Sequence, residues 1–186
     1  MTARLAVATA AAILLASKSF AQTVYVDANL TTGGNDGSSW TDAFQGPNGL
    51  QDALSVSVAG NDIFVADGTY VPAAGGSRYA SFRLQNNVRI LGGFAGGESS
   101  PDARPAFGVA ESILSGDLAG DDAMGGSRAE NSFHVVRTDS TDATAVLDGF
   151  TIRGGNSNGP GGYTNRGGGV LCVGSASSTI QNCRFI

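Results

Sequence analysis

The feature that most constrains the fold is a six-residue pattern that recurs at nearly constant spacing. It occupies residues 113–118 (ILSGDL), 147–152 (LDGFTI) and 180–185 (IQNCRF), whose starts are 34 and 33 residues apart. Each copy has apolar or small residues at i, i+3 and i+5, whereas an uninterrupted strand would have them at i, i+2 and i+4. The offset predicts two short strands joined by a tight turn at 148–149 and 181–182, because Gly and Asn tolerate the left-handed backbone.

A second series of apolar segments keeps the same period. Residues 133–136 (FHVV) and 169–172 (GVLC) alternate with the main pattern, and Val135 and Val170 are 35 residues apart. A looser copy of the main pattern lies at 90–94 (ILGGF). Two series with one period favour stacked repeats over a sandwich, whose hairpin turns recur about every 8–12 residues. We therefore predict an all-β fold, a right-handed parallel β-helix (solenoid) with one N-terminal capping helix.

This fold predicts a register. Ile113, Leu147 and Ile180 should lie in one column at about 4.8 Å per repeat. Val135 and Val170 should lie in another column. Each column would be buried.

The first 21 residues resemble a secretory signal peptide. Arg4 precedes an apolar run at 5–16, and small residues, Ser19 and Ala21, stand at −3 and −1 of a cleavage site after Ala21. The run is too short to cross a bilayer comfortably. We expect a secreted protein or one of the cell envelope, in the outer membrane or the extracellular space.

The predicted organisation has three parts: a signal peptide at 1–21, an N-terminal strand, loop and capping helix at 22–62, and β-helix coils at 63–186. The helix should start after Asn48 and end by Gly60. Its predicted apolar face comprises Leu50, Ala53, Leu54 and Val58. Trp40 is expected to pack in the core beside this helix. Because the sequence stops at Ile186, at the last copy of the pattern and with no closing helix or polar cap after it, we expect the chain to be the N-terminal part of a longer one.

The net charge of the chain limits the classes of partner that it can bind. The formal net charge is −5, and removing Arg4 and Lys18 with the signal peptide makes it −7. An acidic chain disfavours nucleic acid and anionic membranes. Membrane association is expected only through regions outside this chain.

Cys172 and Cys183 both fit apolar positions of the repeat; free thiols are favoured over a disulfide, although export permits one.

Several stretches resemble a known group of proteins: 40–43 (WTDA), 63–70 (IFVADGTY), 113–118 with Asp121 and Asp122, 147–152, 167–170 (GGGV) and 182–185 (NCRF). Together they resemble secreted bacterial right-handed parallel β-helix repeat proteins with the pectin-lyase-like fold. The last two are similar to the repeats of chlamydial-type polymorphic outer membrane proteins. The resemblance implies a fold and export, and it implies no particular activity.

Candidate metal ligands cluster in one loop. Asp117, Asp121 and Asp122 lie within six residues, and carboxylates are the ligands that Ca²⁺ prefers. Their spacing matches no calcium-loop motif. An acidic turn that faces solvent is the favoured interpretation, so we expect no cofactor and little effect of Ca²⁺ on melting. Asp139 and Asp142 form a second acidic turn.

Catalytic candidates are weaker still, and the catalytic residues stay unknown. A glycosidase needs two carboxylates close to each other. Asp117 and Asp148 occupy related places in neighbouring repeats, so they are the candidates for such a pair. A lyase would need a basic residue, for which the candidates are Arg89, Arg153 and Arg184. His134, the single histidine, is expected to point outward as an ordinary surface residue. The Gly pairs and triplets lack the strand–loop–helix context of a nucleotide site.

Two functions remain. The favoured one is a non-catalytic, exported cell-surface segment that presents a surface for adhesion or for binding polysaccharides or cell-surface glycans. The alternative is a polysaccharide lyase or glycoside hydrolase whose active site lies mostly beyond residue 186. The sequence names no ligand.

Overall fold

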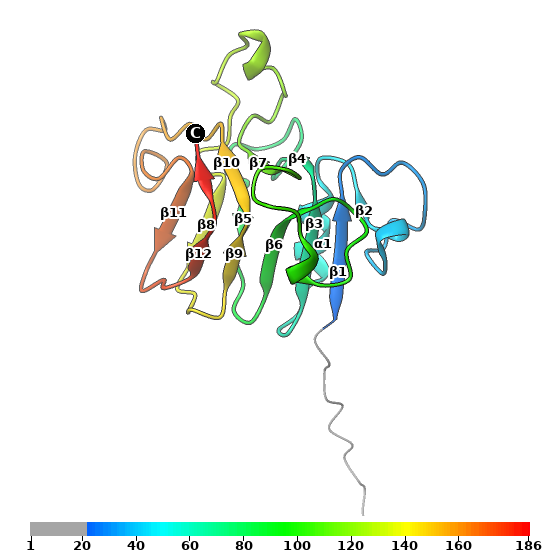
Figure 1. Ribbon diagram of the computed structural model, residues 1–186. Helices are drawn as coiled ribbons and strands as arrows, with labels where there is room; N and C mark the ends of the chain where they lie inside the picture. Colours follow the sequence, from blue (N-terminus) through cyan, green and yellow to red (C-terminus); the bar gives the residue numbers. More distant parts are fainter. Residues whose placement is uncertain (1–21) are drawn as a thin grey trace, which may run out of the picture.

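The computed structural model describes residues 22–186. The predicted signal peptide, residues 1–21, lies outside the described part. Figure 1 shows the strands lying side by side across the molecule, with one α-helix, α1 (Gly49–Val56), near the N-terminal strands. Short 3-10 turns occur at η1 (Trp40–Asp42), η2 (Pro101–Ala103) and η3 (Asp122–Met124).

The strands form three sheets. Sheet A has the order β12-β9-β6-β3-β1-β2. Its strands are β1 (Thr23–Asp27), β2 (Phe44–Gln45), β3 (Asp62–Ala66), β6 (Arg89–Phe94), β9 (Val146–Asp148) and β12 (Thr179–Gln181). Sheet B has the order β13-β10-β7-β4, formed by β4 (Gly68–Tyr70), β7 (Ser112–Ser115), β10 (Phe150–Arg153) and β13 (Arg184–Phe185). Sheet C has the order β11-β8-β5, formed by β5 (Phe82–Arg83), β8 (Val136–Asp139) and β11 (Val170–Val173).

This arrangement corrects the predicted fold class. In place of one all-β, right-handed β-helix solenoid, residues 22–186 form thirteen strands in three separate parallel sheets together with one α-helix, an α/β-like arrangement. The periodicity indicated where strands recur along the chain. It carried no information on how the hydrogen-bonded ladders are divided among sheets.

The chain visits the three sheets in rotation. From β3 onward, successive strands belong to sheets A, B and C in turn, so each strand pairs with the strand three places later. Every pairing is parallel. A single residue with a positive φ separates β9 from β10, which follow each other in the sequence: Gly149 has a φ of +86°. The tight turns predicted at 148–149 and 181–182 are therefore confirmed, since Asn182 also has a positive φ of 50°.

The predicted columns are partly wrong. Leu147 pairs with Ile180 in sheet A, as predicted, and its other neighbour in that sheet is Ile90. Ile113 lies instead in sheet B, opposite Thr69 and Thr151. Val170 pairs with Val136, so the second column is displaced by one residue.

One apolar core is shared by all three sheets and by α1. Its largest fully buried side chains include Tyr70, Phe82, Phe150, Ile90 and Leu147. The helix contributes Leu50, Ala53 and Leu54, as predicted, whereas Val58 lies beyond its end and is exposed. Asn48 precedes the helix, but its side chain accepts a hydrogen bond from the Ala74 amide instead of capping the helix.

A smaller aromatic cluster covers the other face of sheet A. Phe64 and Phe94 stack at 4.4 Å, and Trp40 packs against Tyr25 at 4.9 Å and Phe94 at 5.6 Å between ring centroids. The Trp40 indole donates to the Glu98 carbonyl at 2.8 Å. Trp40 is therefore a packing residue, as expected, but in this second cluster.

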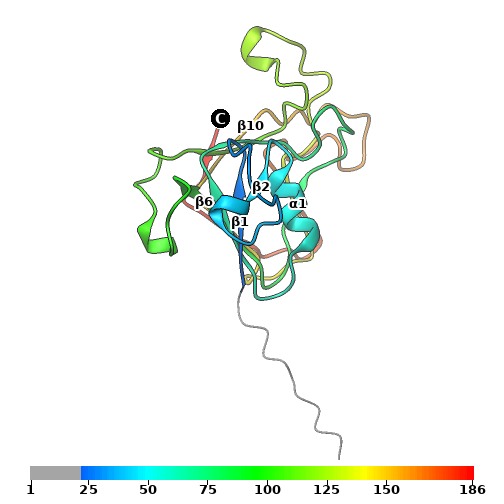
Figure 2. The same ribbon diagram turned by 90° about the vertical axis from the view of Figure 1, so that its right-hand side faces the viewer.

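Long excursions leave the strand body. Figure 2 shows the green excursion between β6 and β7 and the yellow-green excursion between β7 and β8 projecting in different directions. The second of these, residues 116–131, carries the predicted acidic cluster and is called the acidic loop below. Within residues 22–186 we find no helix with the length and hydrophobicity of a transmembrane span.

Candidate functional site

The acidic loop begins at Gly116, where the end of β7 lies against the end of β10. Gly116 donates to the Arg153 carbonyl at 2.9 Å, and a Cβ on Gly116 would lie 2.5 Å from the Gly154 carbonyl oxygen. Only glycine fits this approach. The next residue, Asp117, organises the turn: its carboxylate accepts the backbone N–H groups of Gly120, Asp121 and Asp122 at 2.7, 3.2 and 3.1 Å.

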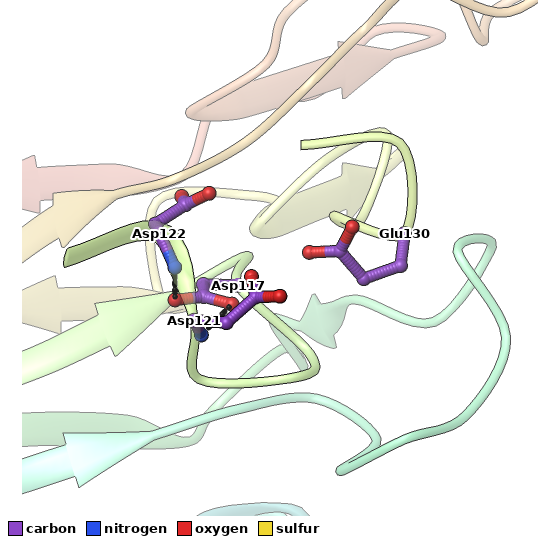
Figure 3. A group of neighbouring side chains, drawn as sticks. All are labelled: Asp117, Asp121, Asp122 and Glu130. Carbon is purple, nitrogen blue, oxygen red and sulfur yellow. Dashed lines mark hydrogen bonds between the residues drawn. The ribbon is translucent and has the colours of Figure 1, made fainter. Parts of the chain in front are cut away.

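Four carboxylates meet in this loop. One oxygen from each of Asp117, Asp121, Asp122 and Glu130 lies within 4.8 Å of the others. Figure 3 shows the Glu130 carboxylate directed across the loop toward Asp117 and Asp121. The structure thus brings together the three predicted residues and adds Glu130, which the sequence analysis missed because it lies 13 residues from Asp117 with no intervening periodicity.

Several oxygens of this cluster lack donors. Asp121 Oδ1, Asp122 Oδ1 and Glu130 Oε1 are inaccessible to solvent and have no hydrogen-bond partner within residues 22–186. Asn131, whose residue exposure is 0%, donates through Nδ2 to Asp122 Oδ2 at 2.9 Å and to the Gly154 carbonyl at 2.7 Å. Its Oδ1 is also buried and has no partner in the described part of the chain.

An arginine of the same loop lies beside the four carboxylates. Arg128 Nε lies 3.7 Å from Asp122 Oδ2, and the Arg128 side chain is 70% exposed. A single, mostly solvated guanidinium compensates little of the charge of four clustered carboxylates. The loop therefore carries a local excess of negative charge.

The acidic loop also forms one wall of a cavity of about 650 Å³. We call this cavity pocket 1. Its apolar wall includes Pro47, Val71 and Leu118, and its polar groups are Thr69, Ser115, Asp117, Asp122, Arg128 and Arg153. Strands β4, β7 and β10 of sheet B supply Thr69, Ser115 and Arg153. The volume is within the range of ligand sites, roughly 300–1,000 Å³, and donors and acceptors line the same space.

A second cavity of about 240 Å³, pocket 2, lies beside the β9–β10 turn. It contains Asp148, whose side chain is only 8% exposed, together with Arg104 and Phe107. Asp148 accepts from Arg104 Nη2 at 3.1 Å and from Asn182 Nδ2 at 2.8 Å. Burial opposes the charged form of Asp148, but these donors outweigh it and hold the pKa of Asp148 below its ordinary value.

The predicted catalytic candidates do not converge. Asp117 and Asp148 line different cavities. Arg89 is paired with Asp62, and Arg184 with Glu111, while Arg153 lines pocket 1.

The other acidic turn is also occupied by local contacts. Asp139 pairs with Arg83 and Arg137, and Asp142 accepts from the Thr144 amide at 2.9 Å. Hydrogen bonds from the Thr144 side chain and amide hold the pKa of Asp142 below its ordinary value. Both residues have local structural roles.

Two expectations for single residues were wrong. His134 does not point to solvent: it is 5% exposed, and its Nδ1 lies 3.1 Å from the Gly167 carbonyl oxygen. Cys172 is exposed instead of occupying the core, whereas Cys183 is half-buried. Within residues 22–186 both cysteines are free thiols.

Comparisons with protein-family models, with curated proteins and with solved structures found no match.

Proposed function

We propose that this chain is an exported, non-catalytic binding module of the cell envelope or extracellular space, and that pocket 1 takes part of a glycan. The observation that supports the proposal is the lining of pocket 1. Hydroxyl, carboxylate and guanidinium groups face the same space as an apolar wall. A sugar presents both hydroxyl groups and C–H surfaces, so it can use both kinds of lining.

Export is proposed from the sequence alone, from the charged and apolar segments within residues 1–21. The net negative charge favours neutral glycans over polyanionic ones. Adhesion would follow from binding glycans of another cell or of a matrix.

The test is a glycan array probed with the exported chain, followed by calorimetry with each glycan that binds. Arg153→Ala removes a donor from pocket 1, and we expect it to weaken binding by roughly tenfold. Arg166→Ala is the matched control, because Arg166 is also exposed but lies outside the pocket lining. Equal affinities of the two variants would place any glycan site elsewhere.

Turnover is measured on the same glycans. New reducing ends or unsaturated sugars would support the lyase or hydrolase alternative. An array on which no glycan binds would contradict the proposed function.

A further inference from the structure

We propose that pocket 2 is a second carbohydrate site, which binds one neutral sugar ring through Phe107, Asn182 and the ion pair of Arg104 with Asp148. Pockets 1 and 2 have no lining residue in common. Binding at pocket 2 is therefore independent of the function proposed for pocket 1, and the two sites can be tested separately.

Segments that are distant in the sequence build pocket 2. Strand β6, the β9–β10 turn and the β12–β13 turn contribute to its lining, and the excursion between β6 and β7 adds Pro101, Arg104, Pro105 and Phe107. The volume of about 240 Å³ lies just below the range of roughly 300–1,000 Å³ for sites that take drug-sized ligands. A compact ligand of one ring matches this space.

The Asp148 carboxylate in this pocket is held in place but is not saturated. Its side chain is only 8% exposed. Within residues 22–186 it accepts from Arg104 Nη2 at 3.1 Å, Asn182 Nδ2 at 2.8 Å and Gln181 Nε2 at 3.3 Å. An ionised carboxylate has about four acceptor positions. One position is therefore left for a donor from a ligand.

The Arg104 guanidinium is fixed in the same way. It donates through Nε to the Pro101 carbonyl, through Nη1 to the Gly92 carbonyl and through Nη2 to Asp148. Of the five N–H groups of an arginine, one on Nη1 and one on Nη2 are then left without a partner in the described chain. The ion pair thus offers two donors and one acceptor at fixed positions.

This combination selects the class of ligand. A hydroxyl group both donates and accepts, so two adjacent hydroxyls can use the Arg104 donors and the Asp148 acceptor together. The charges of Arg104 and Asp148 oppose each other, so the pair gives no strong preference for an ionic ligand, and the carboxylate would repel a phosphate. A neutral ligand with adjacent hydroxyl groups fits best.

The apolar part of the lining requires that this ligand be a ring. Phe107 is 53% exposed although it is large and apolar, and it lines pocket 2 together with Pro101 and Pro105. The C–H face of a sugar ring can pack against such a surface while hydroxyls at the edge of the ring bind the ion pair. An acyclic polyol lacks the face, and a hydrocarbon ring lacks the hydroxyls.

The test is titration of the exported chain with the methyl glycosides of glucose, galactose and mannose, followed by amide NMR. We expect at least one of them to bind with a millimolar Kd. The saturable shifts should occur at the amides of Gly93 and Gly149, which line pocket 2. Cyclohexanol, which has a ring but a single hydroxyl, should bind much more weakly.

Two variants leave the ion pair itself in place. Phe107→Ala removes the exposed aromatic wall and should weaken binding by roughly tenfold. Asn182→Gly removes the amide but retains the backbone, because glycine readily adopts the φ of 50° found at Asn182, and it should weaken binding by roughly fivefold. Tyr79→Ala is the matched control, since Tyr79 is 70% exposed and lines neither pocket, and its affinity should equal that of the parent.

The outcomes separate the two sites. The proposal for pocket 2 would be overturned if no glycoside gave a saturable shift, if cyclohexanol bound as tightly, or if folded Phe107→Ala kept the parent affinity. Shifts at Gly120 and Gly154, with binding lost in Arg153→Ala, would place the sugar in pocket 1. That result would support the function proposed above and overturn the assignment of pocket 2.

Discussion

Arg104 Nη2 lies 3.1 Å from Asp148 Oδ2, and this ion pair joins the excursion between β6 and β7 to the turn between β9 and β10. Arg104 also donates to the Gly92 carbonyl at 3.0 Å and to the Pro101 carbonyl at 3.0 Å. Both charged side chains are largely buried, with exposures of 20% and 8%. The pair therefore connects sheet A to a long loop that covers it.

Removing the arginine should destabilise the fold. Arg104→Ala leaves the buried Asp148 carboxylate without its cation, although Asn182 and Gln181 still donate to it. We expect a loss of about 2 kcal/mol in the free energy of unfolding, measured by urea denaturation. Arg83→Ala breaks an exposed pair with Asp139 and should change this free energy by less than about 0.5 kcal/mol. Equal losses in the two variants would contradict the structural role of Arg104.

The same carboxylate predicts a pH dependence. The pKa of Asp148 is lowered from its ordinary value of 3.8, so the unfolded chain binds a proton more readily than the folded chain. The resulting stabilisation is present above pH 3.8 and is lost as the pH falls through the lower folded-state pKa. We expect the stability difference between the parent and Asp148→Asn, measured by urea denaturation, to shrink in acid. A difference that is constant from about pH 6 to about pH 3 would exclude this linkage.

Much of the strand pattern was predictable because short apolar segments recur at a fixed spacing. Leu147 opposite Ile180 and the turn at Gly149 follow directly from that spacing. The error at Ile113 has a specific cause. In the copies at 147–152 and 180–185, the turn lies within the six residues. The copy at 113–118 instead begins inside β7, whose residues 112–115 pair with residues 150–153 of β10. The similarity of the hexapeptides therefore hid a shift of the turn relative to the strands.

The candidate site was predictable only in part. Asp117, Asp121 and Asp122 are neighbours in sequence, so their proximity needed no knowledge of the fold. Glu130 and Asn131 approach them only because the acidic loop returns to sheet B, and no periodicity indicates where an irregular loop returns. The burial of His134 depends likewise on the later loop that contains Gly167.

Because Leu147 is buried in sheet A, its substitution should lower the free energy of unfolding strongly. This side chain is fully buried in the core that the three sheets share. Leu147→Ala should cost about 2–5 kcal/mol through lost burial and the cavity that remains, and Leu147→Asp should cost more because it buries a charge. Val109→Ala, at a side chain 74% exposed, is the control and should be nearly neutral. Urea denaturation measures all three, and an unchanged Leu147→Ala would contradict the register.

Export predicts a defined N-terminus. If residues 1–21 act as a signal peptide, mass spectrometry of the exported protein should find a chain that begins at Gln22. Ala21→Pro should block cleavage, because a small residue is required at −1. Recovery of the intact Met1 chain as the sole form in the cytoplasm would contradict export.

The β9–β10 turn predicts a strict requirement for glycine at position 149. Gly149 has a φ of +86°, and a Cβ there would lie 2.8 Å from the Gly92 carbonyl oxygen and 3.1 Å from Arg104 Nη1. Gly149→Ala should therefore cost about 1–3 kcal/mol, from the left-handed backbone and from displacement of sheet A neighbours. Gly46→Ala separates the two causes, since Gly46 has a φ of +70° but no atom lies within 4 Å of the position that a Cβ would occupy. We expect urea denaturation to show a smaller loss for Gly46→Ala, of about 1 kcal/mol, because it bears the backbone strain alone. Equal losses at the two glycines would show that the close approach of β6 and the β9–β10 turn contributes nothing to stability.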